Sequence, residues 1–174
     1  MTRLLEHLRD RLVPAVLMAT GLTLVAAGLA IDFPVIRPPG GATTYPPCDV
    51  AMYIQQLGQP GEGRGTYLYA HARPGMFLPL LEASRVDRGS GMLGDLVQVW
   101  TSDDRLFLYV ISEVRPHQLT LDDAIAATTE QLWLQTSEGP RGTKPKLQVV
   151  ATYLSSGPAD HASAHPVARP VICG

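Results

Sequence analysis

Alternating apolar and polar side chains dominate the second half of the chain. Such alternation, or a short apolar run, is typical of β-strands. The segments with this pattern are residues 96–101, 105–113, 131–136 and 146–154. A polar turn at 102–104 separates the first two segments and predicts a β-hairpin. An earlier β-like run, residues 66–70, ends at His71.

Helical signals in the chain are short and few. Residues 76–81 predict a loop with one helical turn, and residues 120–128 predict a short helix that begins with a capped turn at 120–123. The 15 prolines and 16 glycines break long elements and argue against a helical bundle. The pattern therefore predicts an all-β domain, a small barrel or sandwich with a helical insertion.

An uncharged segment lies near the N-terminus. At a rise of about 1.5 Å per residue, residues 12–31 are long enough to cross a hydrocarbon core of about 30 Å. Arginines precede the segment, so an uncleaved anchor would keep the N-terminus in the cytoplasm and place the rest outside the cell. We expect such an anchor. A cleaved signal peptide, suggested by the small residues at 26–30, and a buried core helix are the alternatives.

The sequence divides into five parts on this interpretation. Residues 1–11 are the expected cytoplasmic N-terminus, 12–31 the transmembrane anchor, and 32–47 a spacer rich in proline and glycine. The folded β-domain is expected at 48–154, and a tail rich in proline and alanine at 155–174. The expected location is the cell membrane, with a single membrane-spanning helix and an extracellular domain.

Composition excludes several classes of function. The 14 basic and 16 acidic residues give a net charge of −2, which excludes nucleic-acid binding through bulk positive charge. Two cysteines are too few for a cysteine-rich zinc module. The glycine-rich stretch 61–65 resembles a phosphate-binding loop, but a predicted strand follows it where such a loop needs a helix.

Histidines near the C-terminus have the spacing of metal ligands. His161 and His165 are four residues apart and lie beside Asp160. The segment is rich in proline and alanine, however, and the sequence indicates no further ligand near it. We therefore predict no metal site and no cofactor.

Several stretches, taken in order, resemble the sortase family of membrane-anchored cell-surface transpeptidases. Residues 60–71 form a strand that leads to an Ala-His pair, where the family has Gly-His. Residues 94–114 are similar to the family's Gly-Asp-x-Val hairpin, and 132–137 lie where the family has Thr-Leu-x-Thr-Cys. Residues 146–151 correspond to its last strand, which begins with an arginine. The resemblance covers roughly residues 55–154.

This resemblance implies an eight-stranded sortase-like β-barrel with short helical insertions, and a site for a peptide or protein sorting signal. His71 keeps the family's histidine, whereas Ser137 replaces the nucleophilic cysteine. Lys146 takes the place of the arginine, and Thr136 matches the threonine before the nucleophile. Arg141, in the preceding loop, is the alternative to Lys146 and a candidate substrate contact.

The replacements weaken the chemistry that the family carries out. A cysteine attacks as its thiolate, whereas a serine needs a positioned base, for which His71 is the candidate. Lysine lacks the planar guanidinium group of arginine, which presents several N–H donors in a fixed geometry. Loss of one donor to the oxyanion lowers the reaction rate by about 10²–10³. Each residue also has an ordinary interpretation: Ser137 as a turn residue, His71 as a strand-end residue bonded to backbone, Lys146 as a solvated strand start, and Thr136 as a β-former.

The two cysteines lie at opposite ends of the predicted domain. In an exported protein, Cys48 and Cys173 suggest a disulfide that fastens the C-terminal tail. A nucleophilic role for one of them is the alternative, although neither occupies the family's nucleophile position.

Three functions are open at this point. The favoured one is a membrane-anchored, sortase-like protein that binds an extended peptide outside the membrane, with a degenerate site and weak or no catalysis. The second is an active acyl-transferase or hydrolase that cleaves a sorting-signal peptide, with Ser137 as nucleophile, His71 as base, and Lys146 or Arg141 as the cationic contact. The third is a structural scaffold. The sequence leaves open whether the protein is an enzyme.

Overall fold

The computed structural model describes residues 35–37, 47–140 and 142–173. The predicted anchor, residues 12–31, and Arg141 lie outside the described residues. Among the described residues, no helix is both long enough and apolar enough to cross a membrane.

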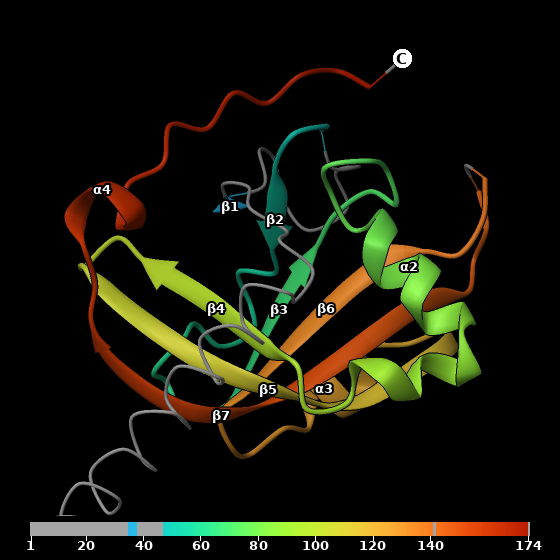
Figure 1. The fold of residues 1–174 in the computed structure, drawn as a ribbon, viewed down its shortest axis with the longest axis horizontal. Helices are drawn as coiled ribbons and strands as arrows, with labels where there is room; N and C mark the ends of the chain where they lie inside the picture. The colour runs from blue at the N-terminus through green and yellow to red at the C-terminus, as the bar shows by residue number, and fades with distance from the viewer. Residues whose placement is uncertain (1–34, 38–46, 141, 174) are drawn as a thin grey trace, which may run out of the picture. The chain divides into compact units, whose positions relative to one another are not determined.

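One curved sheet forms the body of the domain (Figure 1). Its strands are β1 (Val35–Ile36), β2 (Ala51–Tyr53), β3 (Gly65–Tyr69), β4 (Leu96–Thr101), β5 (Arg105–Gln118), β6 (Gln131–Ser137) and β7 (Lys146–Pro158). They are hydrogen-bonded in the order β1-β2-β3-β6-β7-β5-β4. The predicted all-β class is therefore confirmed, as a half-barrel in which the described residues form seven strands where eight were expected.

Helices are short and peripheral, as Figure 1 shows. They are α2 (Leu78–Arg85), the 3₁₀ segment η1 (Asp87–Met92), α3 (Asp122–Ile125) and α4 (His161–Ala164). α2 is longer than the single turn predicted at 76–81, because it buries Leu80 and Leu81 against the sheet. Short helices of this kind are what the many glycines and prolines of the sequence predicted.

The pairing of strands follows the predicted pattern where the connections are short. β4 and β5 form the expected hairpin, closed by the pairing of Thr101 with Arg105. β3 and β6 run parallel, which requires the long intervening connection. β5 and β7 pair with three shifts in register, and bulges of this kind bend a sheet. These shifts explain why the sheet curls into a half-barrel.

Two hydrophobic clusters cover the two faces of the sheet. In β6, Leu132 and Leu134 point into one cluster, which α2 also joins, whereas Trp133 points into the other with Tyr67 and Val150. Successive side chains of a strand point to opposite faces, so the alternation fixes which residues share a face. Ser137 is four residues after Trp133 and thus belongs to the Trp133 face.

Several predicted boundaries are wrong. β5 extends to Gln118, past its predicted end at 113, so His117 lies in a strand. The predicted helix at 120–128 is a single turn, Asp122–Ile125, without a side-chain cap. The carbonyl of Thr120 instead accepts a hydrogen bond from Gln148, which ties the expected cap residue to the sheet.

Strands also extend into segments that the sequence suggested were irregular. β7 continues to Pro158, past the predicted end at 154, because its last residues pair with the start of β5. Val35 and Ile36, within the predicted spacer, pair with β2, and Ile36 packs against the Trp133 cluster.

The glycine-rich loop is fastened by an acidic residue of this chain. The backbone N–H groups of Gly61 and Gly63 donate to the two carboxylate oxygens of Glu130, at 2.9 and 2.7 Å. Both glycines have positive φ, which turns their N–H groups inward, as in an anion-binding nest. The buried Tyr109 hydroxyl donates to the same carboxylate at 2.7 Å, and burial is the main cause of its raised pKa. The loop thus binds a carboxylate of its own chain.

Removal of this carboxylate should destabilise the domain. We expect Glu130→Ala to lower the free energy of unfolding by about 1.5–3 kcal/mol, because it leaves three donors without their charged acceptor. Glu62→Ala is the matched control, since Glu62 lies in the same loop but is exposed, and it should have little effect. Urea unfolding of both variants tests this, and equal losses would contradict the proposed role of Glu130.

Candidate functional site

Three neighbouring strands bring the predicted site residues to one end of the sheet. The parallel ladder pairs Tyr69 of β3 with Gln135 of β6, and Ala70 extends it by donating to the Gln135 carbonyl at 3.1 Å. β3 ends at Tyr69, and its register continued by two residues would bring His71 level with Ser137. On the other side of β6, Ser137 pairs with Lys146, the first residue of β7. The order of strands is therefore β3, β6, β7, with Ser137 next to Lys146 and His71 just beyond the end of β3.

Lys146 contacts Ser137 directly. Its ammonium group donates to Ser137 Oγ at 3.2 Å and to the carbonyl of Thr143 at 2.7 Å. Both side chains are half-buried. The carbonyl holds the ammonium group in place, so a positive charge is fixed beside the hydroxyl.

His71 lies beside a disulfide bond. The residue follows the end of β3, is buried, and its carbonyl accepts a hydrogen bond from Phe77 N at 3.0 Å. A ring nitrogen of His71 lies within 4.8 Å of the sulfur atoms of both Cys48 and Cys173. The imidazole is thus confined next to the point where the tail is attached.

The disulfide joins Cys48 to Cys173 across 125 residues, with Cα atoms 5.4 Å apart. Next to it, Cys48 and Val171 exchange two backbone hydrogen bonds of 2.9 and 3.3 Å. The end of the tail is therefore held against the start of the domain. Both cysteines are consumed in this bond, so neither is available as a nucleophile in this oxidised form.

Thr136 and Arg141 complete the set of predicted site residues. Thr136 is buried, and its hydroxyl donates to the Ala70 carbonyl at 3.0 Å. It therefore ties the two strand ends together. Arg141 lies outside the described residues.

An acidic residue beside Ser137 is bound to a histidine that the sequence gave no reason to select. The Glu138 carboxylate accepts from the backbone N–H of His117 and contacts its Nδ1, both at 2.9 Å. The His117 backbone has a positive φ of 61°, which turns both groups toward Glu138. No local motif could have indicated this pair, because His117 lies in β5 and Glu138 follows the end of β6. Glu138 is thus engaged away from the Ser137–Lys146 pair.

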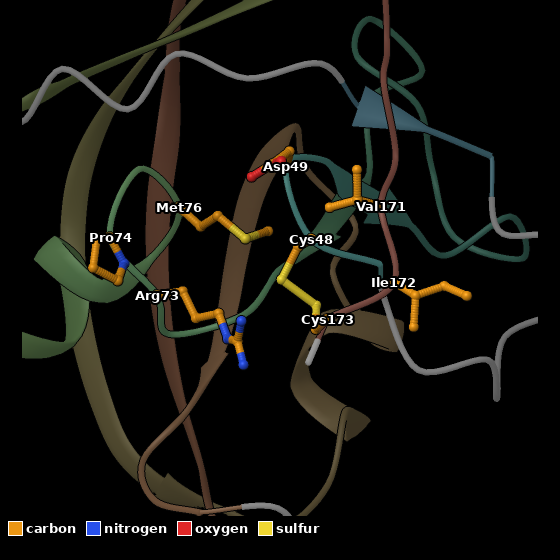
Figure 2. Close-up of a pocket in the computed structure, with 8 residues that line it drawn as sticks. All are labelled: Cys48, Asp49, Arg73, Pro74, Met76, Val171, Ile172 and Cys173. Atoms are coloured by element: carbon orange, nitrogen blue, oxygen red, sulfur yellow. A yellow bond between two sulfur atoms is a disulfide. The ribbon is translucent and has the colours of Figure 1, made fainter.

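A pocket of about 290 Å³ lies next to the disulfide (Figure 2). Figure 2 shows Arg73 and Met76 extending toward the disulfide, with Ile172 of the tail on its other side. The lining combines the guanidinium group of Arg73 and the carboxylate of Asp49 with apolar side chains, and the residues are Cys48, Asp49, Arg73, Pro74, Met76, Val171, Ile172 and Cys173. Because the disulfide lies within reach of His71, this pocket adjoins the histidine side of the candidate site.

A hydrogen-bonded network fills the sheet face below Ser137. The Tyr67 hydroxyl donates to Gln135 Oε1 at 2.8 Å and accepts from Gln148 Nε2 at 3.0 Å. The same amide group of Gln148 reaches the Thr120 carbonyl at 2.9 Å. Burial raises the pKa of Tyr67 above its ordinary value, so the phenol remains protonated. This network holds β3, β6 and β7 in their register.

A second pocket, of about 420 Å³, lies farther along the same strands. Its lining includes Trp133 and Arg115, whose guanidinium lies 5.4 Å from the indole ring and also forms an ion pair with Asp123. It is toward the Gln131 end of β6, whereas Ser137 is the last residue of that strand. The sequence gave no signal for this pocket.

Solved structures with a similar fold are sortases. Sortase A of Listeria monocytogenes aligns with a TM-score of 0.56 and 18% identity, over 72% of this chain and 81% of that one. A lid mutant of sortase A from Corynebacterium diphtheriae aligns at 0.53 and 14%, over 71% of this chain and 63% of that one. Sortase C from Clostridium perfringens SM101 gives 0.51 and 13%, with the same coverage of 71% and 63%.

At these identities the likeness shows the fold alone, and the fold is sortase-like. The chain spans less than two thirds of the second and third of these structures. No protein-family model matches the chain. No curated protein matches it either.

The disulfide should contribute substantially to stability. We expect the Cys48→Ser/Cys173→Ser variant to lose about 2–4 kcal/mol of unfolding free energy, because the bond closes a long loop. Urea unfolding of the full chain measures this, and wild type under reducing conditions is the matched control, since it should behave like the variant. A variant as stable as the oxidised wild type would contradict the prediction.

Proposed function

We propose that this protein is a membrane-anchored, sortase-like peptide-binding protein whose transpeptidase site is degenerate, with weak or no turnover. The observation that carries this proposal is the contact between Lys146 and Ser137, in which an ammonium group also bound to Thr143 donates to the serine hydroxyl.

The direction of that hydrogen bond matters for the chemistry. A serine becomes nucleophilic when a base accepts its proton as the oxygen attacks. A protonated Lys146 can only donate, and its hydrogen bond occupies a lone pair of Ser137 Oγ. The same positive charge would stabilise a thiolate at this position, which serine cannot form near neutral pH. The arrangement thus suits a cysteine that this chain lacks.

The surroundings of His71 and Glu138 bear on the other requirements of a serine nucleophile. His71 is the candidate base, and its ring lies beside the disulfide. A catalytic histidine also needs a group that holds its tautomer. Glu138, the carboxylate adjacent in sequence to Ser137, is bound to His117 instead.

Peptide binding is supported by the pocket beside the disulfide. Its apolar walls suit an apolar side chain of an extended peptide, and the charged groups of Arg73 and Asp49 offer polar contacts to the same peptide. The partner that we propose is a peptide or protein sorting signal.

An extracellular location agrees with the disulfide. Disulfides persist in oxidising compartments and are rare in the cytosol. We therefore propose that the uncharged segment 12–31 anchors the chain in the cell membrane, with residues 48–174 on the outer side.

The second candidate function is an active acyl-transferase, and the pairing of Ser137 with Lys146, next to the strand that leads to His71, favours it. In that reaction Ser137 Oγ would bond to the peptide carbonyl carbon as His71 accepts its proton, and Lys146 would stabilise the oxyanion. Collapse would break the C–N bond, and the leaving amine would take the proton from His71. An incoming amine or water would then release the acyl group.

A cysteine introduced at position 137 would report the electrostatics of the site. Both native cysteines are in the disulfide, so Ser137→Cys contains one free thiol. We expect its rate of alkylation by iodoacetamide to show a thiol pKa at least about one unit below the ordinary value of about 8.5, because Lys146 favours the thiolate. Adding Lys146→Met should return that pKa toward its ordinary value. Equal pKa values in both variants would contradict the proposed role of Lys146.

A covalent probe separates the two candidate functions. A fluorophosphonate labels activated serines, and intact-mass measurement of the full chain detects a single adduct. The proposed function predicts no labelling above that of Ser137→Ala. Labelling that requires both Ser137 and His71 would establish the acyl-transferase instead.

A further inference from the structure

Two histidines and an aspartate converge at the far end of the sheet. Asp104 is in the turn between β4 and β5, whereas His161 is the first residue of α4 and His165 follows that helix. Arg105, next to Asp104, pairs with Pro158 at one end of β7, and Ser137 pairs with Lys146 at the other. β7 has 13 residues, so the two places are roughly 40 Å apart along the strand. The cluster is therefore separate from the Ser137 site.

Both imidazole rings point at one carboxylate. His161 Nδ1 lies 2.9 Å and His165 Nε2 3.0 Å from the same Asp104 oxygen, and the ring centroids are 4.1 Å apart. All three donor atoms lie within 4.8 Å of one another. The hydrogen bond from His161 lowers the pKa of Asp104.

The backbone on both sides builds this arrangement. Asp104 has a positive φ of 58°, and its carbonyl accepts from Ala159 N at 2.8 Å, which places the chain just before α4 against the turn. Asp160 caps the helix by accepting from Ser163 N at 3.0 Å. Four residues make slightly more than one turn, so His161 and His165 lie on one side of α4. Asp104 lies 57 residues before His161 in the sequence, so the sequence did not indicate that the two would meet.

We propose that Asp104, His161 and His165 form a binding site for a divalent transition metal ion, and that Zn²⁺ is the ion best suited to it. Two imidazole nitrogens and one carboxylate oxygen form a donor set that zinc accepts, with water completing the shell. The harder ions Mg²⁺ and Ca²⁺ prefer sites made of oxygen donors. This proposal replaces the expectation, drawn from the sequence, that the chain has no metal site.

Two of the three distances between donor atoms are close to those that the ion requires. Zinc–nitrogen bonds of about 2.0–2.1 Å in a tetrahedron set neighbouring donors about 3.3 Å apart. The two nitrogen–oxygen distances are already 2.9 and 3.0 Å, so each must widen by only a few tenths of an ångström. The side chains of His161, His165 and Asp104 are 74%, 39% and 46% exposed, which leaves the ion a path from solvent.

The other group of possible metal ligands in the described residues does not qualify. It consists of Cys48, His71 and Cys173. Its two sulfurs are bonded to each other, and a disulfide is not the thiolate ligand that zinc requires.

A bound ion would fasten the C-terminal segment at a second point. The disulfide holds the end of this segment at Cys173, and the metal would hold its beginning at α4. The stretch between them includes Val171 and Ile172, which line the pocket near His71. The ion would thus limit the motion of the segment that borders this pocket.

Zinc titration of the full chain, purified without an affinity tag and dialysed against EDTA, tests the proposal. We expect one Zn²⁺ per chain by competition with a chromophoric chelator, and His161→Ala, His165→Ala and Asp104→Asn should each weaken binding by about tenfold or more. His117→Ala is the matched control, because it removes an exposed histidine outside the cluster. Its zinc affinity should equal that of wild type, and Mg²⁺ should not compete.

Two readouts on the wild-type chain do not depend on how the variants fold. Bound Co²⁺ should give visible absorption typical of nitrogen and oxygen ligands, and its paramagnetism should broaden the NMR signals of His161 and His165 selectively. Zn²⁺ should also raise the midpoint of thermal unfolding, and the rise should increase with the logarithm of the free Zn²⁺ concentration above its Kd. No zinc binding by wild type, or equal binding by the His161→Ala/His165→Ala variant, would overturn the proposal and leave a plain hydrogen-bonded cluster.

Discussion

The register of β3, β6 and β7 is the constraint on which the candidate site depends. It pairs Tyr69 with Gln135 and Ser137 with Lys146, and so lines up residues that are far apart in the sequence. A slip of one residue in β7 would remove Lys146 from Ser137 and turn every side chain of that strand to the opposite face. Such a slip would break the two hydrogen bonds that the Gln148 amide donates to the Tyr67 hydroxyl and the Thr120 carbonyl.

Given this register, the properties of the site follow from which side chains occupy it. The ammonium group of Lys146 is fixed by Thr143 and therefore remains beside the hydroxyl of Ser137. The neighbouring position belongs to His71, whose surroundings are set by the attachment of the tail. Our proposal is that this sortase-like fold keeps the geometry of a site whose groups do not exchange a proton. Such a chain would be an example of the separation between fold and chemistry.

The sequence predicted those parts of the structure that local pattern determines. Alternation located β4 to β7, and the hairpin at Thr101 and Arg105 followed from its polar turn. Boundaries were less accurate where tertiary contacts decide them, as when Gln148 binds the Thr120 carbonyl and the predicted helix shortens to one turn. The resemblance to sortases supplied the fold, and the register explains why Ser137 and Lys146 meet.

What the sequence could not predict are contacts between distant segments that leave no local trace. Glu138 and His117 meet because His117 adopts a positive φ in a strand that extends further than its pattern suggested. Asp104 reaches His161 and His165 only because β7 runs to Pro158 and returns the tail to the β4–β5 turn. Each case depends on the path of the whole chain, which periodicity over a few residues does not contain.

The most direct test of the central claim is the turnover of peptides carrying sortase sorting motifs by the full chain, measured by mass spectrometry in three forms. Wild type and Ser137→Ala should be equally inactive, and Ser137→Cys should exceed both, because Lys146 favours a thiolate at that position. Cleavage by wild type that is clearly faster than by Ser137→Ala would show that Ser137 is a working nucleophile and would contradict the account of a degenerate site.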